Sequence, residues 1–304
     1  MRSVRVIGRT LSVIAAVCLV GAGLAGCSSD PTENCSGALP TGSESGMVKA
    51  QGPLGSNISV SVPAPVLSST SQRTVLKLGN GARVHKGTSV ELTYTAINGG
   101  TGKVAGRSAS RQWLPITSDT VSKALECVPA GSRVAVVLSP HDAGLQVAVS
   151  AIYVIDVLHV YPSRADGSVR PSRSGFPTVV LAPNGQPGVS INPSDPAPTS
   201  VRSEVLKAGS GATVTATSEV VVQYTAVDWE QKTVTTSTWS TGSPDLVDMA
   251  SGQSQLQSQQ NSSLSTDMLR ELIGHRVGSQ LLIETPETST SGAAAWVVDV
   301  VGVR

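Results

Sequence analysis

Aromatic residues are scarce in this 304-residue sequence: Phe, Trp and Tyr together make up 3%, and Phe176 is the single phenylalanine. A pocket built mainly of aromatic side chains is therefore short of material. Cysteine and histidine are also rare, with four of each and no cluster, so we expect neither a metal site nor a cofactor. Charge of one sign is not in excess, with 22 Lys and Arg against 21 Asp and Glu, so we expect no nucleic-acid partner.

The first 27 residues predict export from the cytoplasm. Arg2, Arg5 and Arg9 precede an apolar run at 11–25, which fits a signal peptide and is short for a membrane span. The run ends Leu24-Ala25-Gly26-Cys27, which resembles the bacterial lipobox, where cleavage before the cysteine leaves it lipidated. We therefore expect a signal peptide at 1–26 and a lipid anchor at Cys27 that holds the protein on the cell membrane, outside the cytoplasm. The alternative is an ordinary cleaved signal peptide with a cysteine nearby by chance.

Two cysteines, Cys35 and Cys127, remain once Cys18 leaves with the signal peptide and Cys27 carries lipid. Two thiols in an oxidising compartment are more often paired than free, so we predict a disulfide between them. The alternative is a pair of free buried thiols.

An internal duplication organises the rest of the chain, because four segments recur in the same order. The matching segments are 75–84 with 205–214, 92–97 with 222–227, 125–140 with 272–286, and 153–158 with 296–301. Eight of the eighteen prolines fall between 161 and 200, which indicates an extended seam between the copies. The predicted divisions are a lipidated tether at 27–46, a first domain at 47–161, a linker at 162–174 and a second domain at 175–304.

Most of each copy alternates with a period of two between Gly and Ser breakers, which is typical of β-strands. The segments 178–181 and 188–191 flank a Pro-Asn-Gly turn and predict a hairpin that opens the second copy. A helix is expected at 266–273, where Leu269, Leu272 and Ile273 share one face, and its counterpart at 118–125. Each copy is therefore predicted as an α+β domain, an antiparallel sheet packed on one short helix.

The second copy resembles the FKBP-type peptidyl-prolyl cis–trans isomerases over nearly its whole length. The residues that carry the resemblance, in family order, are Gly209-Ser-Gly211, 221–225, 234–239, Gly242-Ser-Pro244, 272–279, Pro286 and 296–302. The resemblance implies two FKBP-like domains, each a curved antiparallel sheet wrapped around one short helix. The first copy matches through its similarity to the second.

Carried over by this resemblance, the candidate catalytic residues are Tyr224, Met268 and Trp296, which would line the pocket for a proline ring. The chain departs from the family at Thr235 and Thr236, where a Phe and the carboxylate are usual, and at Met268, where a Trp is usual. Leu264-Ser265 replaces a Val-Ile pair, and no tyrosine follows Pro286 in the flap. In the first copy, Tyr94 and Tyr153 occupy the positions of Tyr224 and Trp296.

The implied function is a membrane-anchored prolyl isomerase or chaperone that acts on proline-containing polypeptides outside the cytoplasm. Isomerisation of an X–Pro bond needs no nucleophile or metal, because a pocket that desolvates the amide weakens its resonance. The departures in the pocket favour an alternative, a catalytically inactive lipoprotein that binds proteins or has a structural role in the envelope.

Overall fold

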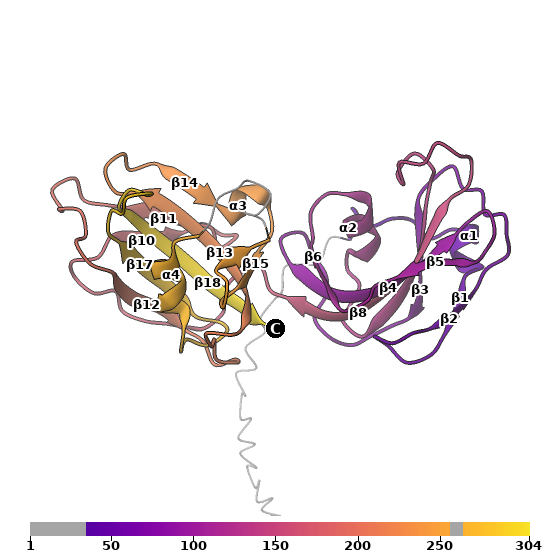
Figure 1. Ribbon diagram of the computed structural model, residues 1–304, viewed down its shortest axis with the longest axis horizontal. Helices are drawn as coiled ribbons and strands as arrows, with labels where there is room; N and C mark the ends of the chain where they lie inside the picture. Colours follow the sequence, from indigo (N-terminus) through magenta and orange to yellow (C-terminus); the bar gives the residue numbers. More distant parts are fainter. Residues whose placement is uncertain (1–34, 256–263) are drawn as a thin grey trace, which may run out of the picture. The chain divides into compact units, whose positions relative to one another are not determined.

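The computed structural model describes residues 35–255 and 264–304, and these are mostly β-sheet with few helices (Figure 1). The predicted signal peptide at 1–26, Cys27 and the rest of the tether up to residue 34 lie outside the described residues. Within the described ranges, no helix is long and apolar enough to cross a membrane. The small share of helix is consistent with an FKBP-like fold, and the α+β class stays a prediction.

The first sheet is antiparallel and has six strands within the described residues. Strand β6 pairs with β4 off the main path of the sheet. In spatial order the strands are β3 (Gln72–Lys77), β7 (Ser132–Leu138), β8 (Ala151–Tyr161), β4 (Ser89–Asn98) and β5 (Val104–Arg107), with β6 (Gln112–Pro115) beside β4.

The second sheet is also antiparallel and has eight strands in the described part of the chain. Its two long central strands, β13 and β18, have ten residues each and pair at nine positions. In spatial order the strands are β16 (Gln253–Ser254), β15 (Asp245–Asp248), β13 (Glu219–Asp228), β18 (Ala294–Val303), β17 (Gln280–Thr285), β12 (Arg202–Ala208) and β9 (Ser168–Val169), with β14 (Val234–Ser237) beside β13.

Each sheet is covered by a short helix on one face and by a hairpin on the other. In the first sheet these are α2 (Thr120–Leu125) and the hairpin of β1 (Lys49–Gln51) with β2 (Ser59–Ser61). In the second they are α4 (Thr266–Leu272) and the hairpin of β10 (Thr178–Leu181) with β11 (Pro187–Ser190), which was expected from the sequence. Two further helices, α1 (Ser43–Gly46) and α3 (Thr238–Thr241), have four residues each.

The duplication seen in the sequence is repeated in the register of the strands. Ala96 lies opposite Tyr153 across β4 and β8, and Ala226 lies opposite Trp296 across β13 and β18. β-Bulges also recur, for example in β3 after Val75 and in β12 after the matching Val205. Equivalent residues of the two copies therefore occupy equivalent places in the sheets. The domain boundaries given above stay a prediction.

Helix α4 follows from local sequence signals. The Ser265 hydroxyl caps its N-terminus by accepting a hydrogen bond from the backbone N–H of Met268, at 3.4 Å. The helix ends before Gly274, whose φ of +88° lies in the left-handed region that favours glycine. Leu269 and Leu272 are buried as expected, but Ile273 is 43% exposed, because the chain is already extended at that residue.

Residues 162–174, predicted as a linker, pack against the second sheet. Strand β9 pairs with the end of β12, and Ala165 is 1% exposed. The N–H of Ala165 donates a hydrogen bond to the buried carboxylate of Asp299, at 2.8 Å. The proline-rich composition correctly indicated extended backbone. It did not show that a backbone N–H of this segment donates a hydrogen bond to a buried acceptor of the sheet.

The described end of the predicted tether, residues 35–46, is also packed rather than free. Ser45 of α1 is fully buried, and its N–H donates to the side chain of Gln72 at 3.1 Å. Cys35 forms a disulfide with Cys127, directly after α2, with 5.8 Å between the two Cα atoms. This segment is therefore held against the first sheet by the disulfide and by the contacts of Ser45.

Candidate functional site

The three candidate residues of the second copy meet on the face of the sheet that packs against α4. Tyr224 comes from β13 and Trp296 from β18, with 6.0 Å between their ring centroids and 57° between their planes. Met268 comes from α4 and belongs to the same apolar cluster. Tyr224 is 1% exposed, Met268 0% and Trp296 8%. The structure thus brings the three together, but as a packed core in which their own side chains fill the space.

A buried carboxylate, Asp245, lies at the Tyr224 hydroxyl and was missed by sequence reasoning. The hydroxyl of Tyr224 donates a hydrogen bond to Oδ2 of Asp245, at 3.2 Å, and the hydroxyl of Ser254 bonds to the same oxygen. Asp245 is fully buried on β15. The sequence did contain a signal, since Asp245 alternates with Val247 along a short strand and so shares its inward face.

An open cleft lies beside Trp296, at the N-terminal end of α4. Its volume is about 590 Å³, within the range of ligand pockets. Leu264, Ala294 and Trp296 supply its apolar surface. Its remaining lining is polar and consists of Asp228, Thr235, Ser265, Thr266, Asp267, Thr285, Thr288, Thr290, Ser291 and Gly292.

The geometry of this cleft suits binding more than bond-breaking chemistry. The indole N–H of Trp296 donates to the Thr285 hydroxyl at 3.2 Å, which fixes the ring as one wall. Hydroxyl groups around that wall offer donors and acceptors to a peptide backbone. Met268 and Tyr224 do not line the cleft, so only one of the three candidates faces it. Within the described residues, no group of three or more His, Cys, Asp or Glu side chains could hold a metal ion.

The tyrosines of the first copy form a similar but smaller aromatic pair. Tyr94 and Tyr153 are partly buried, with their ring centroids 6.1 Å apart and their planes at 70°. Trp113 of β6 packs against a cluster that includes Tyr161.

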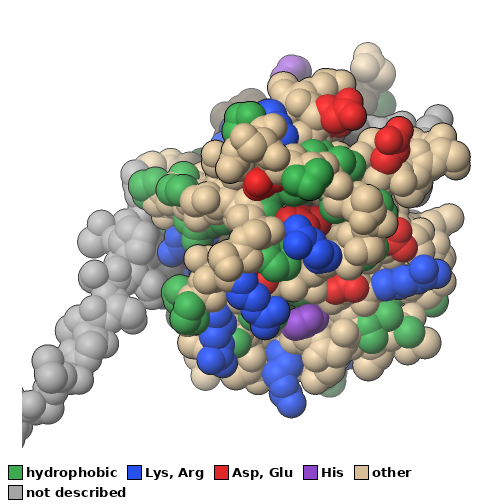
Figure 2. All heavy atoms as spheres, turned by 90° about the vertical axis from the view of Figure 1, so that its left-hand side faces the viewer, with side chains coloured by type: hydrophobic (Ala, Val, Ile, Leu, Met, Phe, Trp, Pro, Cys, Tyr) green, Lys and Arg blue, Asp and Glu red, His purple; other side chains and the backbone are tan. Residues whose placement is uncertain are grey.

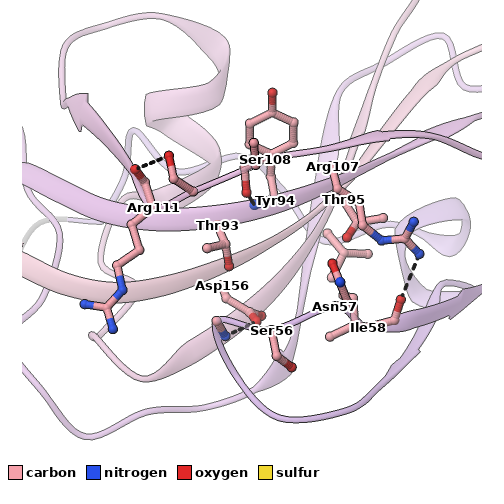
Figure 3. Close-up of a pocket in the computed structure, with 14 residues that line it drawn as sticks. Ser56, Asn57, Ile58, Thr93, Tyr94, Thr95, Arg107, Ser108, Arg111 and Asp156 are labelled. Atoms are coloured by element: carbon pink, nitrogen blue, oxygen red, sulfur yellow. Dashed lines mark hydrogen bonds between the residues drawn. The ribbon is translucent and has the colours of Figure 1, made fainter.

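A polar cavity of about 310 Å³ lies in the first sheet, on the face covered by the β1–β2 hairpin. Thr93, Thr95 and Asp156 contribute to its lining, together with residues from the turn at 55–58. The ring of Tyr94 points away from Asp156 (Figure 3). The cavity is lined by Tyr94 but not by Tyr153, so it coincides only in part with the aromatic site expected from the resemblance.

Comparisons with known proteins give likeness in structure alone. No family model matches the chain, and no curated protein matches its sequence. The structure of the three FKBP domains of wheat FKBP73 is 13% identical, covers 77% of this chain and 94% of its own, and has a TM-score of 0.31. A peptidyl-prolyl cis–trans isomerase from Pseudomonas syringae is 20% identical, covers 32% of this chain and 81% of its own, and has a TM-score of 0.26.

FkpA from Escherichia coli is 16% identical, covers 31% of this chain and 49% of its own, and has a TM-score of 0.28. All three TM-scores are below 0.5, and similarity at that level does not establish a shared fold or activity. What the protein does is therefore inferred from its own residues.

Proposed function

We propose that this protein is an FKBP-like lipoprotein, held outside the cytoplasm by lipid on Cys27, that binds proline-containing polypeptides in the cleft beside Trp296. The observation that carries the proposal is the cleft itself, where an indole ring, Leu264 and Ala294 form an apolar surface surrounded by hydroxyl groups. A proline ring would lie against the indole. The peptide backbone beside it would exchange hydrogen bonds with the threonines at the cleft's edge.

A peptide bound in the cleft beside Trp296 would have its X–Pro isomerisation accelerated only weakly. The barrier to rotation about a peptide bond is about 18–20 kcal/mol, and a catalyst must stabilise the twisted amide more than the planar one. A buried cleft does so by removing water from the amide. The cleft beside Trp296 is open and largely polar, and the hydroxyl of Tyr224 is sealed in the core on Asp245. We therefore expect peptide binding with slow turnover.

The second candidate function, a lipoprotein that binds proteins without catalysis, is favoured by the filling of the core. Met268 and Tyr224 occupy the space that an enclosed prolyl pocket would need. The two candidates share the binding step and differ in whether the bound X–Pro bond is accelerated.

The first experiment measures binding and turnover on the full chain. Titration calorimetry with a short peptide containing X–Pro, and with its alanine counterpart, should show binding of the proline peptide at least about tenfold tighter. Thr290→Trp should weaken this binding, because Thr290 is exposed and lines the cleft, where the bulky ring would block it. Thr70→Trp, at an exposed position of the first copy, is the matched control. Equal binding by Thr290→Trp would overturn the proposed site.

A protease-coupled isomerisation assay separates the two candidates. Acceleration above the uncatalysed rate that is lost in Thr290→Trp supports the isomerase. No acceleration at micromolar protein, with peptide binding intact, supports the binding lipoprotein.

The anchor is tested separately, because Cys27 lies outside the described residues. We expect Cys27→Ser to release the protein from the membrane fraction, since stable anchoring needs the acyl chains. Retention of Cys27→Ser on membranes would contradict the lipid anchor without touching the peptide site.

A further inference from the structure

A second cavity of the C-terminal copy lies on the opposite face of its sheet, under the β10–β11 hairpin. Its volume is about 480 Å³, and none of its lining residues contributes to the cleft beside Trp296. Phe176, Val179 and Leu206 give it an apolar wall, and all three pack against the hairpin side of the sheet.

Glu204 of β12 lines this cavity and is the buried charge within it. The residue is 3% exposed. Its Oε2 accepts a hydrogen bond from the backbone N–H of Arg173, at 2.8 Å. Its Oε1 is buried and has no hydrogen-bond partner within the described residues. A buried carboxylate oxygen without a partner is costly, so its presence beside a cavity calls for a donor.

The first copy shows that the fold itself does not require this carboxylate. Thr74 is the equivalent of Glu204, because each residue directly precedes the bulged valine of its strand. The Thr74 hydroxyl lies 2.8 Å from the hydroxyl of Ser45, which is fully buried on α1. The same place is thus closed by two paired hydroxyls in one copy and left as a cavity with an unpartnered carboxylate oxygen in the other.

Arg202, two residues before Glu204 on β12, pairs with a different acid. Arg202 donates through Nε to the carboxylate of Glu284, at 2.7 Å, and its guanidinium carbon lies 5.0 Å above the ring of Phe176. Burial raises the pKa of Glu284, and the charge of Glu204 raises it further. Arg202 is therefore engaged by a second buried acid.

Three basic residues line the cavity, namely Arg170, Arg173 and Lys207. The ammonium group of Lys207 donates to the carbonyl oxygen of Ala165, at 3.0 Å. Arg170 and Arg173 are exposed. Basic and acidic side chains are both visible on the side of the molecule that carries β10 and β12 (Figure 2). The cavity thus combines a buried acceptor, an apolar wall and exposed guanidinium groups.

We propose that this cavity binds a small zwitterion of the α-amino-acid class with an apolar side chain. The ammonium group donates to Oε1 of Glu204, which supplies the missing partner. The carboxylate pairs with the guanidinium of Arg173, whose backbone N–H already holds the other oxygen of Glu204. The apolar side chain packs against Phe176 and Leu206. This site is separate from the proposed peptide cleft and does not depend on it.

The test uses the full chain and three probes that differ by one charged group: L-leucine, 3-methylbutylamine and 4-methylpentanoate. Titration calorimetry should show binding of L-leucine at least about tenfold tighter than of either single-charge analogue, since hydrogen bonds to charged groups are the strong ones. No binding of L-leucine at 10 mM, or equal binding of an analogue that lacks one of the charges, would overturn the proposal.

Variants assign the site to Glu204. Glu204→Gln keeps the size of the side chain and removes its charge, and we expect at least a tenfold loss of L-leucine affinity. Glu230→Gln, at an exposed position of the turn after β13, is the matched control and should bind as the unchanged protein does. Binding unaltered by Glu204→Gln would contradict the assignment. If that variant does not fold, the rise in Tm of the unchanged protein with L-leucine, and its absence with both analogues, supports the proposal, while equal rises overturn it.

Discussion

The phenolic hydroxyl of Tyr224 donates its hydrogen bond to Asp245, 3.2 Å away, inside the core of the second sheet. The two residues are 1% and 0% exposed, so neither group reaches the solvent. The resemblance to prolyl isomerases implies a hydroxyl and a carboxylate at the edge of a pocket. In this chain the pair is present but sealed, and the carboxylate comes from a different strand than the family pattern suggests. The pair therefore stabilises the fold and does not touch a bound peptide.

Replacing this tyrosine should separate stability from binding. We expect Tyr224→Phe to lower the free energy of unfolding by about 1–3 kcal/mol, because the Asp245 oxygen loses a donor that no solvent replaces. Peptide binding in the cleft should change less than twofold, since the ring remains. Urea unfolding and calorimetry measure the two effects.

The matched control is Tyr153→Phe in the first copy, whose hydroxyl makes no hydrogen bond within the described residues. This variant should change stability by less than about 1 kcal/mol. A loss of peptide affinity in Tyr224→Phe without a loss of stability would place the hydroxyl at the substrate instead.

Met268 tests whether the core holds an unfilled pocket. The family residue at this position is a tryptophan. If an unfilled pocket lay beside Met268, the variant Met268→Trp would fit into it and bind peptide more tightly. Because Met268 is fully buried among Tyr224, Leu269 and Leu272, the larger ring has no space. We expect Met268→Trp to destabilise the protein by about 1–3 kcal/mol through overpacking. Met268→Leu, which conserves volume, should cost less than about 1.5 kcal/mol. Thermal unfolding of both variants measures the difference, and a stable Met268→Trp that binds peptide more tightly would contradict the filled core.

Features fixed by neighbouring residues were predictable from the sequence. The start of α4 at the Ser265 cap and the β10–β11 hairpin depend on a few adjacent side chains, and the structure has them where they were expected. The disulfide partners were assigned by elimination, and the structure pairs them. Features that depend on residues far apart were missed. Asp245 meets Tyr224 across 21 residues, and Ala165 meets Asp299 across 134. No local pattern encodes such a pairing, so the hydrogen bond between Tyr224 and Asp245 and the packing of the predicted linker became visible only in the structure.

The Cys35–Cys127 disulfide should stabilise the first copy by restricting its unfolded chain. The two residues are 92 positions apart, and chain-entropy models give about 4 kcal/mol for a loop of that order. We expect the double variant Cys35→Ser, Cys127→Ser to lower the free energy of unfolding by about 2–5 kcal/mol. Urea unfolding under oxidising conditions measures this loss. The unchanged protein in reducing buffer is the control and should approach the variant, whereas the variant itself should not respond to reductant. A variant as stable as the oxidised protein would show that the pair does not bridge.

Asp299 should make the stability of the second copy depend on pH. Its equivalent, Asp156, is held by the guanidinium of Arg133 at 2.6 Å, whereas Asp299 receives the amide of Gln280 at the same distance. With an amide in place of a paired cation, burial raises the pKa of Asp299 above its ordinary value of 3.8, although its hydrogen bonds and Lys207 act in the opposite direction. A carboxyl with a raised pKa holds its proton more tightly in the folded state than in the unfolded one. The contribution of Asp299 to the free energy of unfolding should therefore rise as pH falls from neutral toward about 4, over the range where only the folded state is protonated.

The sign of this effect gives the test. Asp299→Asn removes the titration while its side-chain oxygen can still accept from Ala165, so the variant should gain less stability between pH 7 and pH 4 than the unchanged protein. Asp228→Asn is the matched control, since Asp228 lies at the end of the neighbouring strand and has no such burial. Urea unfolding at several pH values in that range measures the slopes. The side chain that Asp299→Asn introduces cannot titrate, and the other buried acids are unchanged. If Asp299→Asn leaves the slope of the free energy of unfolding against pH unaltered, or if Asp228→Asn alters it equally, the pH dependence arises from other groups.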